Sequence, residues 1–343
     1  MLMFGPIPLL DVYLFNKFTV RDTITIVLDV LIVILIIFNL ALVYLMHLRS
    51  MKSNAVLPYD GKTYNMILNQ THDLELQQRL GSGHFSEVYK GSLTEKLTHV
   101  QQVVAIKMIK LSYVSVAEID RELSILTVLK CKNIVAYYGM FNSASGTMLV
   151  FELAEQGDLH SYLNALYKGI SPNEVINVLK DRCHDFISFT LQLLDALKYL
   201  ETCKVVHRDL AARNVLLTES GAKLSDFGLS RYLYTKDCYA MSNDGMLAVR
   251  WLAPESIVHR VFSHKSDIYS FAVIVWEMFT LGATPYGYIK AEAVEEAIVR
   301  GFHLRRTDGF PLRVYSILQK CWHRKPADRP SCLELIDYFN LYS

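Results

Sequence analysis

The longest apolar segment of the chain lies near its N-terminus. Residues 23–46 (TITIVLDVLIVILIIFNLALVYLM) carry one ionisable side chain, Asp29, and one side-chain amide, Asn39. Because a helix rises about 1.5 Å per residue, this segment can cross a hydrocarbon core of about 30 Å with some tilt. A cleaved signal peptide, the alternative, has a shorter apolar core and a small-residue cleavage site, and no such site is evident after Met46. We therefore expect a retained transmembrane helix at 23–46, preceded by a short segment, 1–22.

The pattern changes after this predicted span. Residues 47–73 are mostly polar, contain Pro58 and Gly61, and predict a linker. Residues 103–110 (VVAIKMIK) then form an apolar run typical of a strand. Amphipathic patterns that predict helices follow later in the chain, at 118–129, 185–201 and 331–340.

Length, charge and cysteine usage narrow the class of protein. The 343 residues leave room for a large two-lobed domain and a small appendage. The formal net charge is +1, which gives no case for binding nucleic acid. The six cysteines have no CxxC or regular spacing, so reduced cytosolic thiols are expected rather than disulfides or a zinc site.

Residues 207–214 read HRDLAARN and carry the candidate chemistry. On one loop, Asp209 can orient and accept the proton of an incoming hydroxyl, while Asn214 offers a hard oxygen to a magnesium ion. The segment resembles the catalytic loop of protein kinases, H-R-D-L-x-x-x-N. Its Ala211-Ala212-Arg213 resembles tyrosine kinases of the receptor type rather than serine/threonine kinases.

Other segments match the same family in order and spacing. Residues 79–91 (RLGSGHFSEVYKG) resemble the glycine-rich loop, with Ser86 in place of the third glycine. Lys107 resembles the lysine that holds the α- and β-phosphates of ATP, and Glu122 is its expected partner, with Glu118 as the alternative. The residues through which the resemblance implies ATP binding are Gly81, Ser82, Gly83, Val88, Ala105, Lys107, Glu122, Glu152, Ala154 and Leu216.

The hinge and the metal site follow from the same resemblance. In residues 148–159 (MLVFELAEQGDL), Glu152 and Ala154 are expected to offer backbone groups to adenine. Phe151 falls at the gatekeeper position, where it should narrow the pocket behind ATP. Asp226, in a DFG tripeptide, is implied to bind magnesium together with Asn214.

Several residues are implied to support the site rather than to react. His207 and Phe227 are expected to stack beneath it, and Asp267 to anchor the catalytic-loop backbone. The remaining supports implied by the resemblance are Arg208 and a buried ion pair of Glu255 with Arg329.

The segment between Asp226 and Glu255 is expected to regulate activity and choose the substrate. Tyr239 falls where receptor kinases carry their main autophosphorylated tyrosine, and Tyr234 is a second candidate; both are otherwise ordinary loop tyrosines. In 247–256 (LAVRWLAPES) an alanine replaces the proline of the family's platform for a tyrosine ring. Its Val-Arg-Trp remains, so tyrosine preference is expected, with Arg213 as a catalytic residue that contacts the substrate phenol.

The whole pattern is similar to receptor-like tyrosine kinases with a very short ectodomain, of the nematode type. It implies the α+β, two-lobed protein kinase fold over residues 74–343, with a small lobe at 74–152 and the hinge and large lobe at 153–343. The implied reaction transfers the γ-phosphoryl of ATP, with Mg2+, to protein tyrosines. Because ATP is cytosolic, residues 1–22 are expected outside the plasma membrane and the kinase domain in the cytoplasm.

The expected partners are protein tyrosine substrates, the membrane, and a second copy of the chain or a partner receptor. Three alternatives stay open. The first is a pseudokinase scaffold that binds partners without turnover. The second is a serine/threonine kinase, and the third is a ligand receptor that borrows a partner's ectodomain. The five residues central to catalysis oppose the first of these: Lys107, Glu122, Asp209, Asn214 and Asp226.

Overall fold

The computed structural model describes residues 67–83, 86–110, 114–143, 146–233, 238–240 and 248–342. The predicted transmembrane helix at 23–46, the segment 1–22, most of the linker and Tyr234 lie outside these residues. Within the described ranges, no helix is both long and apolar enough to cross a membrane.

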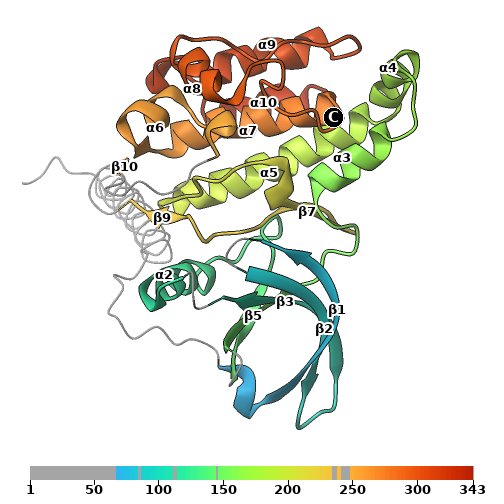
Figure 1. The fold of residues 1–343 in the computed structure, drawn as a ribbon, viewed down its shortest axis with the longest axis vertical. Coiled ribbons are helices and arrows are strands. Elements are labelled where there is room, and N and C mark those ends of the chain that lie inside the picture. Colours follow the sequence, from blue (N-terminus) through green and yellow to red (C-terminus); the bar gives the residue numbers. More distant parts are fainter. Residues whose placement is uncertain are drawn as a thin grey trace, which may run out of the picture. The chain divides into compact units, whose positions relative to one another are not determined.

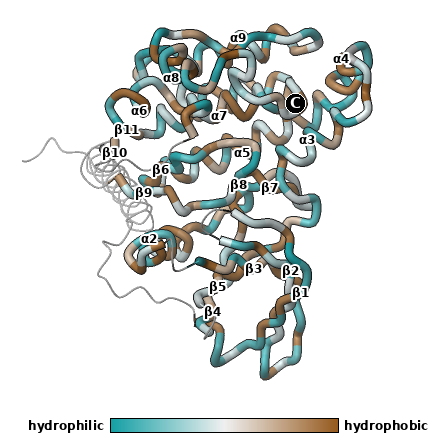
Figure 2. Tube along the Cα trace, in the orientation of Figure 1, coloured by the Kyte–Doolittle hydropathy of each residue, from teal (hydrophilic) through white to brown (hydrophobic). Residues whose placement is uncertain are grey.

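The small lobe is a five-stranded antiparallel sheet with one helix beside it (Figure 1). The strand order is β1-β2-β3-β5-β4. Figure 2 shows apolar positions interspersed among polar ones along β1 and β2. The elements of this lobe are η1 (Leu68–Gln70), β1 (His72–Ser82), β2 (Ser86–Glu95), β3 (Gln101–Ile109), α2 (Val116–Leu126), β4 (Tyr137–Ser143) and β5 (Gly146–Glu152).

Residues 67–73, expected to belong to the linker, are instead part of this lobe. Leu68 is buried in an apolar cluster with residues of the sheet, including Phe141 and Val150. Ile67 forms a parallel bridge with Met140 on the edge strand β4. Two apolar side chains in a short polar stretch gave too weak a pattern to reveal this docking from the sequence.

The large lobe is mostly helical and lies on the other side of the connection after β5 (Figure 1). Its helices are α3 (Leu159–Tyr167), α4 (Pro172–Asp181), α5 (Cys183–Thr202), α6 (Pro254–His259), α7 (His264–Phe279), α8 (Ala291–Val299), α9 (Leu312–Cys321) and α10 (Cys332–Asn340). Its short strands and 3-10 turns are β6 (Val205–Val206), η2 (Ala212–Asn214), β7 (Val215–Thr218), β8 (Gly221–Leu224), β9 (Arg231–Tyr232), β10 (Tyr239–Ala240), η3 (Val249–Trp251), β11 (Val261–Phe262) and η4 (Pro326–Asp328).

Helix α7 forms the centre of the large lobe. Every residue from Ser266 to Phe279 is buried, including two acids, Asp267 and Glu277. The helix contacts α5, α9 and the turns η2 and η3, which carry the candidate catalytic and substrate-binding segments. Buried acids on this helix can therefore reach both segments.

The two-lobed protein kinase fold expected from the sequence is confirmed.

Candidate active site

Strand β3 and helix α2 bring together the first pair of candidate residues. Lys107 Nζ lies 2.8 Å from Glu122 Oε1 and 3.2 Å from Asp226 Oδ1. Burial alone would lower the pKa of Lys107, but the carboxylates of Asp226 and Glu122 outweigh burial and raise it. The ammonium group is therefore charged and fixed between the two lobes, and the ion pair predicted between Lys107 and Glu122 is present.

Glu118, the alternative partner of Lys107, has another role. Its carboxylate accepts hydrogen bonds from the backbone nitrogen and the hydroxyl of Ser115, at 2.8 Å each. The Ser115 hydroxyl in turn accepts from the backbone nitrogen of Glu118, which completes a capping box at the start of α2. One turn later on the same helix, Glu122 is buried and faces the sheet.

The candidate catalytic loop is held from beneath by α7. Asp267 accepts hydrogen bonds from the backbone nitrogens of His207, at 2.8 Å, and Arg208, at 3.1 Å. Arg208 has a φ of +74° and Asp226 a φ of +58°, which are strained values for residues other than glycine. The loop is thus fixed in a backbone conformation that its own residues disfavour.

Asp209 lies at the centre of this loop, with each carboxylate oxygen contacted by a neighbour. Arg213 Nη2 is 2.6 Å from Oδ1, and Asn214 Nδ2 is 2.8 Å from Oδ2. Asn214 Nδ2 also donates to the backbone oxygen of Asp209, at 2.7 Å. These bonds fix the direction of the Asp209 carboxylate, as a group that must meet an incoming hydroxyl requires.

Asn214 and Asp226 offer oxygen atoms suited to a hard divalent cation. Because both Asn214 hydrogen bonds use its amide nitrogen, its amide oxygen points to the other side of the group. The Asp226 side chain is 49% exposed, and Lys107 lowers its pKa, so it is ionised at neutral pH. A carboxylate and an amide oxygen are the donor types that Mg2+ prefers, so these residues fit the ion.

His207 and Phe227 meet beneath the site, but not as a stack. Their ring centroids are 5.0 Å apart and the planes are inclined by 69°, an edge-to-face contact. His207 is fully buried, its Nε2 lies 3.0 Å from the Ser225 backbone oxygen, and burial lowers the pKa of its imidazole. The expectation of stacked rings was wrong because that backbone contact orients the imidazole.

The glycine-rich segment spans the end of β1 and the start of β2. Gly81, Ser82 and Gly83 are exposed, and Val88, half-buried on β2, pairs with Lys107 on β3. Gly83 donates from its backbone nitrogen to the Ser86 backbone oxygen at 2.8 Å. At Gly91, further along β2, a Cβ atom would overlap neighbouring atoms of the sheet, so only glycine fits there.

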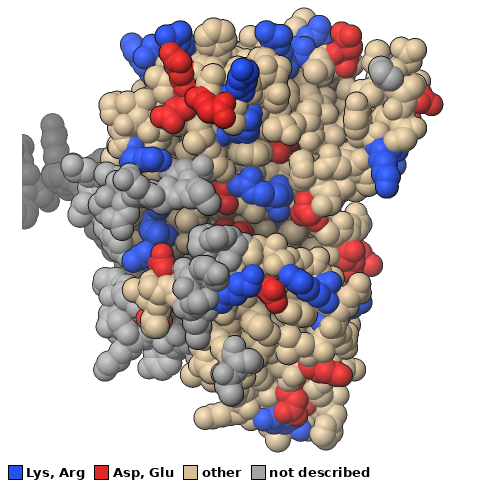
Figure 3. Space-filling view, viewed as in Figure 1, with Lys and Arg blue, Asp and Glu red and all other residues tan. Residues whose placement is uncertain are grey.

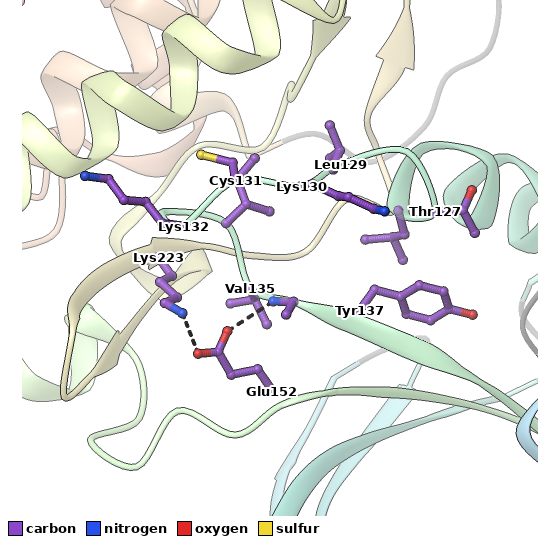
Figure 4. Close-up of a pocket in the computed structure, with 12 residues that line it drawn as sticks. Thr127, Leu129, Lys130, Cys131, Lys132, Val135, Tyr137, Glu152 and Lys223 are labelled. Atoms are coloured by element: carbon purple, nitrogen blue, oxygen red, sulfur yellow. Dashed lines mark hydrogen bonds and ion pairs between the residues drawn. The ribbon is translucent and has the colours of Figure 1, made fainter. Parts of the chain in front are cut away.

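Glu152 at the hinge makes side-chain contacts that the sequence did not predict. Its Oε1 pairs with Lys223 on β8, and its Oε2 accepts from the backbone nitrogen of Ala136 at 3.2 Å. Glu152 and Lys223 line a cavity of about 500 Å³ under the α2–β4 connection, together with Cys131 and Tyr137 (Figure 4). Of the candidate site residues that the structure describes, only Glu152 lines this cavity. Ala105, Ala154 and Leu216 are half-buried; Ala105 pairs with Phe151 across β3 and β5, and Leu216 bridges to Asp158.

Tyr239 contacts the catalytic loop through its ring. Strand β10 pairs with β11, where Tyr239 lies opposite Phe262. The Arg208 guanidinium lies 4.8 Å from the centroid of the Tyr239 ring and 4.4 Å from that of Phe262. Tyr232 donates its hydroxyl to the Ser124 backbone oxygen on α2, at 3.1 Å.

Trp251, in the candidate substrate platform, connects to the catalytic loop by two contacts. The Arg213 guanidinium lies 4.7 Å from the Trp251 ring. The indole Nε1 donates to Glu277 Oε2 at 2.9 Å, and the same oxygen accepts from the Ala212 backbone nitrogen at 3.0 Å. Sequence reasoning missed Glu277; the available signal was a lone acid in an otherwise apolar helix segment, VIVWEMF.

The predicted pair of Glu255 and Arg329 is bidentate, with Arg329 buried and Glu255 half-buried. Arg329 Nη1 and Nη2 each lie 2.7 Å from a different Glu255 oxygen. On the surface, Figure 3 shows Lys and Arg side chains interspersed with Asp and Glu on the viewed face.

Comparisons with known proteins agree with this geometry. Residues 74–339 match the family model described as protein tyrosine and serine/threonine kinase. The chain is 36% identical over 265 residues to Protein sevenless of Drosophila virilis, and 34% identical over 270 residues to the insulin receptor of Xenopus laevis. It is also 34% identical over 280 residues to Tyrosine-protein kinase transmembrane receptor Ror of Drosophila melanogaster.

These alignments take in most of the chain but a minor part of each relative. They cover 75%, 77% and 79% of this chain, and 10%, 20% and 39% of the respective relatives. The likeness is thus confined to the segment that contains the two lobes. The chain belongs to the protein tyrosine and serine/threonine kinase family.

Proposed function

We propose that the chain is a membrane-anchored protein tyrosine kinase, which transfers the γ-phosphoryl group of ATP to tyrosine hydroxyls of proteins. The observation that carries this proposal is the convergence of two fixed groups. Lys107 is held by Glu122 and Asp226 on one side, and the Asp209 carboxylate is held by Arg213 and Asn214 on the other. A scaffold that only binds has no need of a preorganised carboxylate of this kind.

In the proposed reaction, the residues of the chain position groups and stabilise charge. Lys107 binds the α- and β-phosphates, and the backbone of Gly81, Ser82 and Gly83 covers them. Asp209 orients the tyrosine hydroxyl and accepts its proton as the oxygen attacks the γ-phosphorus. Arg213, fixed between Asp209 and Trp251, contacts the phenol.

Asn214 and Asp226 are the residues that would hold Mg2+. When bound, the ion supplies positive charge that neutralises the phosphates as the γ-phosphoryl group departs. Adenine would lie between Val88, Ala105 and Leu216, with hydrogen bonds to the backbone of Glu152 and Ala154.

The activity test uses the full 343-residue chain with ATP, magnesium and a mixed pool of tyrosine and serine/threonine peptides. Mass spectrometry of the products identifies the phosphorylated side chain. Phosphotyrosine is the expected product. Phosphate on serine or threonine alone would support the serine/threonine kinase, and ATP binding without any product would support the scaffold.

Anchoring in the plasma membrane rests on the apolar segment 23–46 and on the relative named as a transmembrane receptor. The proposed orientation places residues 1–22 outside and the kinase domain in the cytoplasm. We expect the chain to stay with membranes during extraction at alkaline pH. Protease added to intact cells should leave the kinase domain uncut, and its cleavage would contradict this orientation.

Tyr239 is proposed as the autophosphorylated switch. Arg208 is buried, and burial together with Arg231 and Arg121 lowers its pKa, so three cationic groups act on one region. A phosphate on Tyr239 would bring about −1.5 to −2 charges toward them and form charge-assisted hydrogen bonds that order the segment. A second copy of the chain, or a partner receptor, would transfer the γ-phosphoryl group of ATP to the Tyr239 hydroxyl in trans and release ADP.

We therefore expect Tyr239→Phe to lower the peptide phosphorylation rate of ATP-treated protein about 10-fold, the effect of one to two charge-assisted hydrogen bonds. The measurement is the initial rate after preincubation with ATP, with phosphosites mapped by mass spectrometry. Tyr288→Phe is the matched control. The Arg305 guanidinium lies 4.4 Å from the centroid of the Tyr288 ring, and Tyr288 lies outside the segment between Asp226 and Glu255. Equal rates for wild type and Tyr239→Phe would contradict the switch.

Phe151 is expected to restrict which inhibitors bind. Its ring packs against Tyr137, with centroids 5.5 Å apart, and fills the space beside Lys107's strand. Phe151→Ala should increase the affinity for ATP-competitive compounds with a bulky aryl group at least about 10-fold, because the ring no longer occupies their pocket. Competition binding measures this change, and an unchanged affinity would show that Phe151 does not block that pocket.

A further inference from the structure

Glu277 is a buried acid that the proposed chemistry does not use. It lies near the end of α7, only 1% exposed, in a helix segment otherwise made of apolar residues. A carboxyl group in such a place costs free energy unless its hydrogen bonds compensate for lost solvation. Its retention in the core therefore calls for a specific function.

The contacts of Glu277 join two segments that are distant in sequence. Oε2 accepts from the backbone nitrogen of Ala212, between Asp209 and Asn214 of the catalytic loop, at 3.0 Å. The same oxygen accepts from the indole Nε1 of Trp251 in the platform, at 2.9 Å. This one oxygen atom therefore holds the loop that contains Asp209 at a fixed distance from Trp251, the residue expected to support the substrate ring.

A second connection closes this arrangement. Arg213 bonds to Asp209 at 2.6 Å and covers the Trp251 ring at 4.7 Å. If Trp251 moved, Arg213 and with it the Asp209 carboxylate would lose their orientation. Lys107, the residue proposed to bind the phosphates directly, is held by Glu122 and Asp226 and not by Glu277.

We propose that Glu277 is a positioning residue for tyrosine substrates, because its carboxylate ties the substrate platform to the catalytic loop. The inference rests on the proposed kinase function. It predicts that Glu277 governs peptide KM and the preference for tyrosine over serine, while the KM for ATP is independent of it.

The protonation of Glu277 offers an independent readout. Burial raises its pKa to about 7, against the lowering effects of the bonds from Trp251 and Ala212 and the charge of Arg213. The titratable or charged groups facing it are Arg213 and His160, whose Nδ1 lies 3.9 Å from Oε1. The Glu277 carboxyl is therefore ionised above about pH 7 and protonated below it. Hydrogen bonds to the ionised form are stronger, so tyrosine selectivity should fall as the pH drops through about 7.

The test compares Glu277→Gln and Glu277→Met in the full-length chain. Glutamine keeps a neutral oxygen acceptor near Oε2, whereas methionine has similar length but only a weakly accepting thioether. We expect the tyrosine-peptide KM to rise about 3-fold in the first and about 10-fold or more in the second, with the ATP KM within about 2-fold of wild type. The fall in selectivity below about pH 7 should disappear in both variants.

Two further variants keep the test decisive. Trp251→Phe removes the indole donor but keeps a ring against Arg213, and combined with Glu277→Met it should add little to the KM effect. Glu296→Gln makes the same exchange on α8, where Glu296 forms an exposed pair with Arg300. It should leave both the peptide KM and the ATP KM unchanged. Multiplicative effects in the double variant, or equal loss of ATP and peptide affinity, would overturn the inference. Inactive wild-type protein would instead refute the kinase function itself.

Discussion

Asp209→Asn is expected to lower the turnover of the chain about 1000-fold while leaving the fold and ATP binding intact. Asparagine has nearly the same shape as aspartate but cannot accept the proton of the attacking hydroxyl, and a positioned base contributes about 100-fold to 10,000-fold. The substitution also replaces one carboxylate oxygen by an amide that donates. Arg213 and Asn214 both donate to that carboxylate, so one of the two would lose its acceptor.

The measurement is the initial rate of tyrosine-peptide phosphorylation, with wild-type protein as reference. ATP affinity serves as the control, because Lys107, the residue proposed to bind the phosphates, is held by Glu122 and Asp226 rather than by Asp209. Thermal unfolding of both proteins excludes misfolding. Turnover within about 10-fold of wild type would mean that another group accepts the proton. In that case Asp209 would only align the loop.

The sequence predicted those parts of the site that are encoded by short, local patterns. The catalytic loop places Asp209, Arg213 and Asn214 within a few residues of one another, so their contacts follow from one turn of backbone. Lys107 and Glu122 were paired because their spacing matches the kinase family, and the structure places them on β3 and on the helix that follows it. In both cases few conformations satisfy the spacing, and the structure adopts one of them.

Contacts between distant segments were predicted only where the family resemblance implied them, as for Asp267 with the catalytic loop and Glu255 with Arg329. Other distant contacts left no signal of their partners in the sequence. Glu152 meets Lys223, and Glu277 meets Trp251 and Ala212, only because separate elements fold against each other. Nothing in the residues adjacent to Glu277 specifies which partner it accepts from. Its burial became apparent only when α7 proved to be enclosed along nearly its whole length.

Backbone strain is a further feature that local sequence reasoning misses. Arg208 and Asp226 adopt positive φ values, where glycine is the residue normally expected. Such conformations persist when surrounding contacts determine them. Asp267 supplies these contacts for Arg208, and Lys107 does so for Asp226. The strain at the site is therefore maintained by Asp267 and Lys107, which lie far from these positions in the chain.

The largest effect on stability is expected at Arg329, whose side chain is fully buried. Besides two bonds to Glu255, it donates to the backbone oxygens of His323 and Lys265, at 2.8 Å each. Arg329→Leu removes all four bonds and leaves the Glu255 carboxylate without its cation. Breaking a buried pair in this way costs about 3–5 kcal/mol, so the melting temperature should fall by about 10 °C.

Thermal unfolding of the full chain measures this change, and two companions interpret it. Arg300→Ala breaks an exposed pair with Glu296 and should cost about 0.5 kcal/mol or less, since solvent screens that pair. The double variant Glu255→Gln with Arg329→Leu should be more stable than Arg329→Leu alone, because it leaves no uncompensated buried charge. If the double variant is the less stable of the two, then the lost packing of Arg329 over Tyr269, 5.2 Å from its ring, accounts for the effect rather than the charge of Glu255.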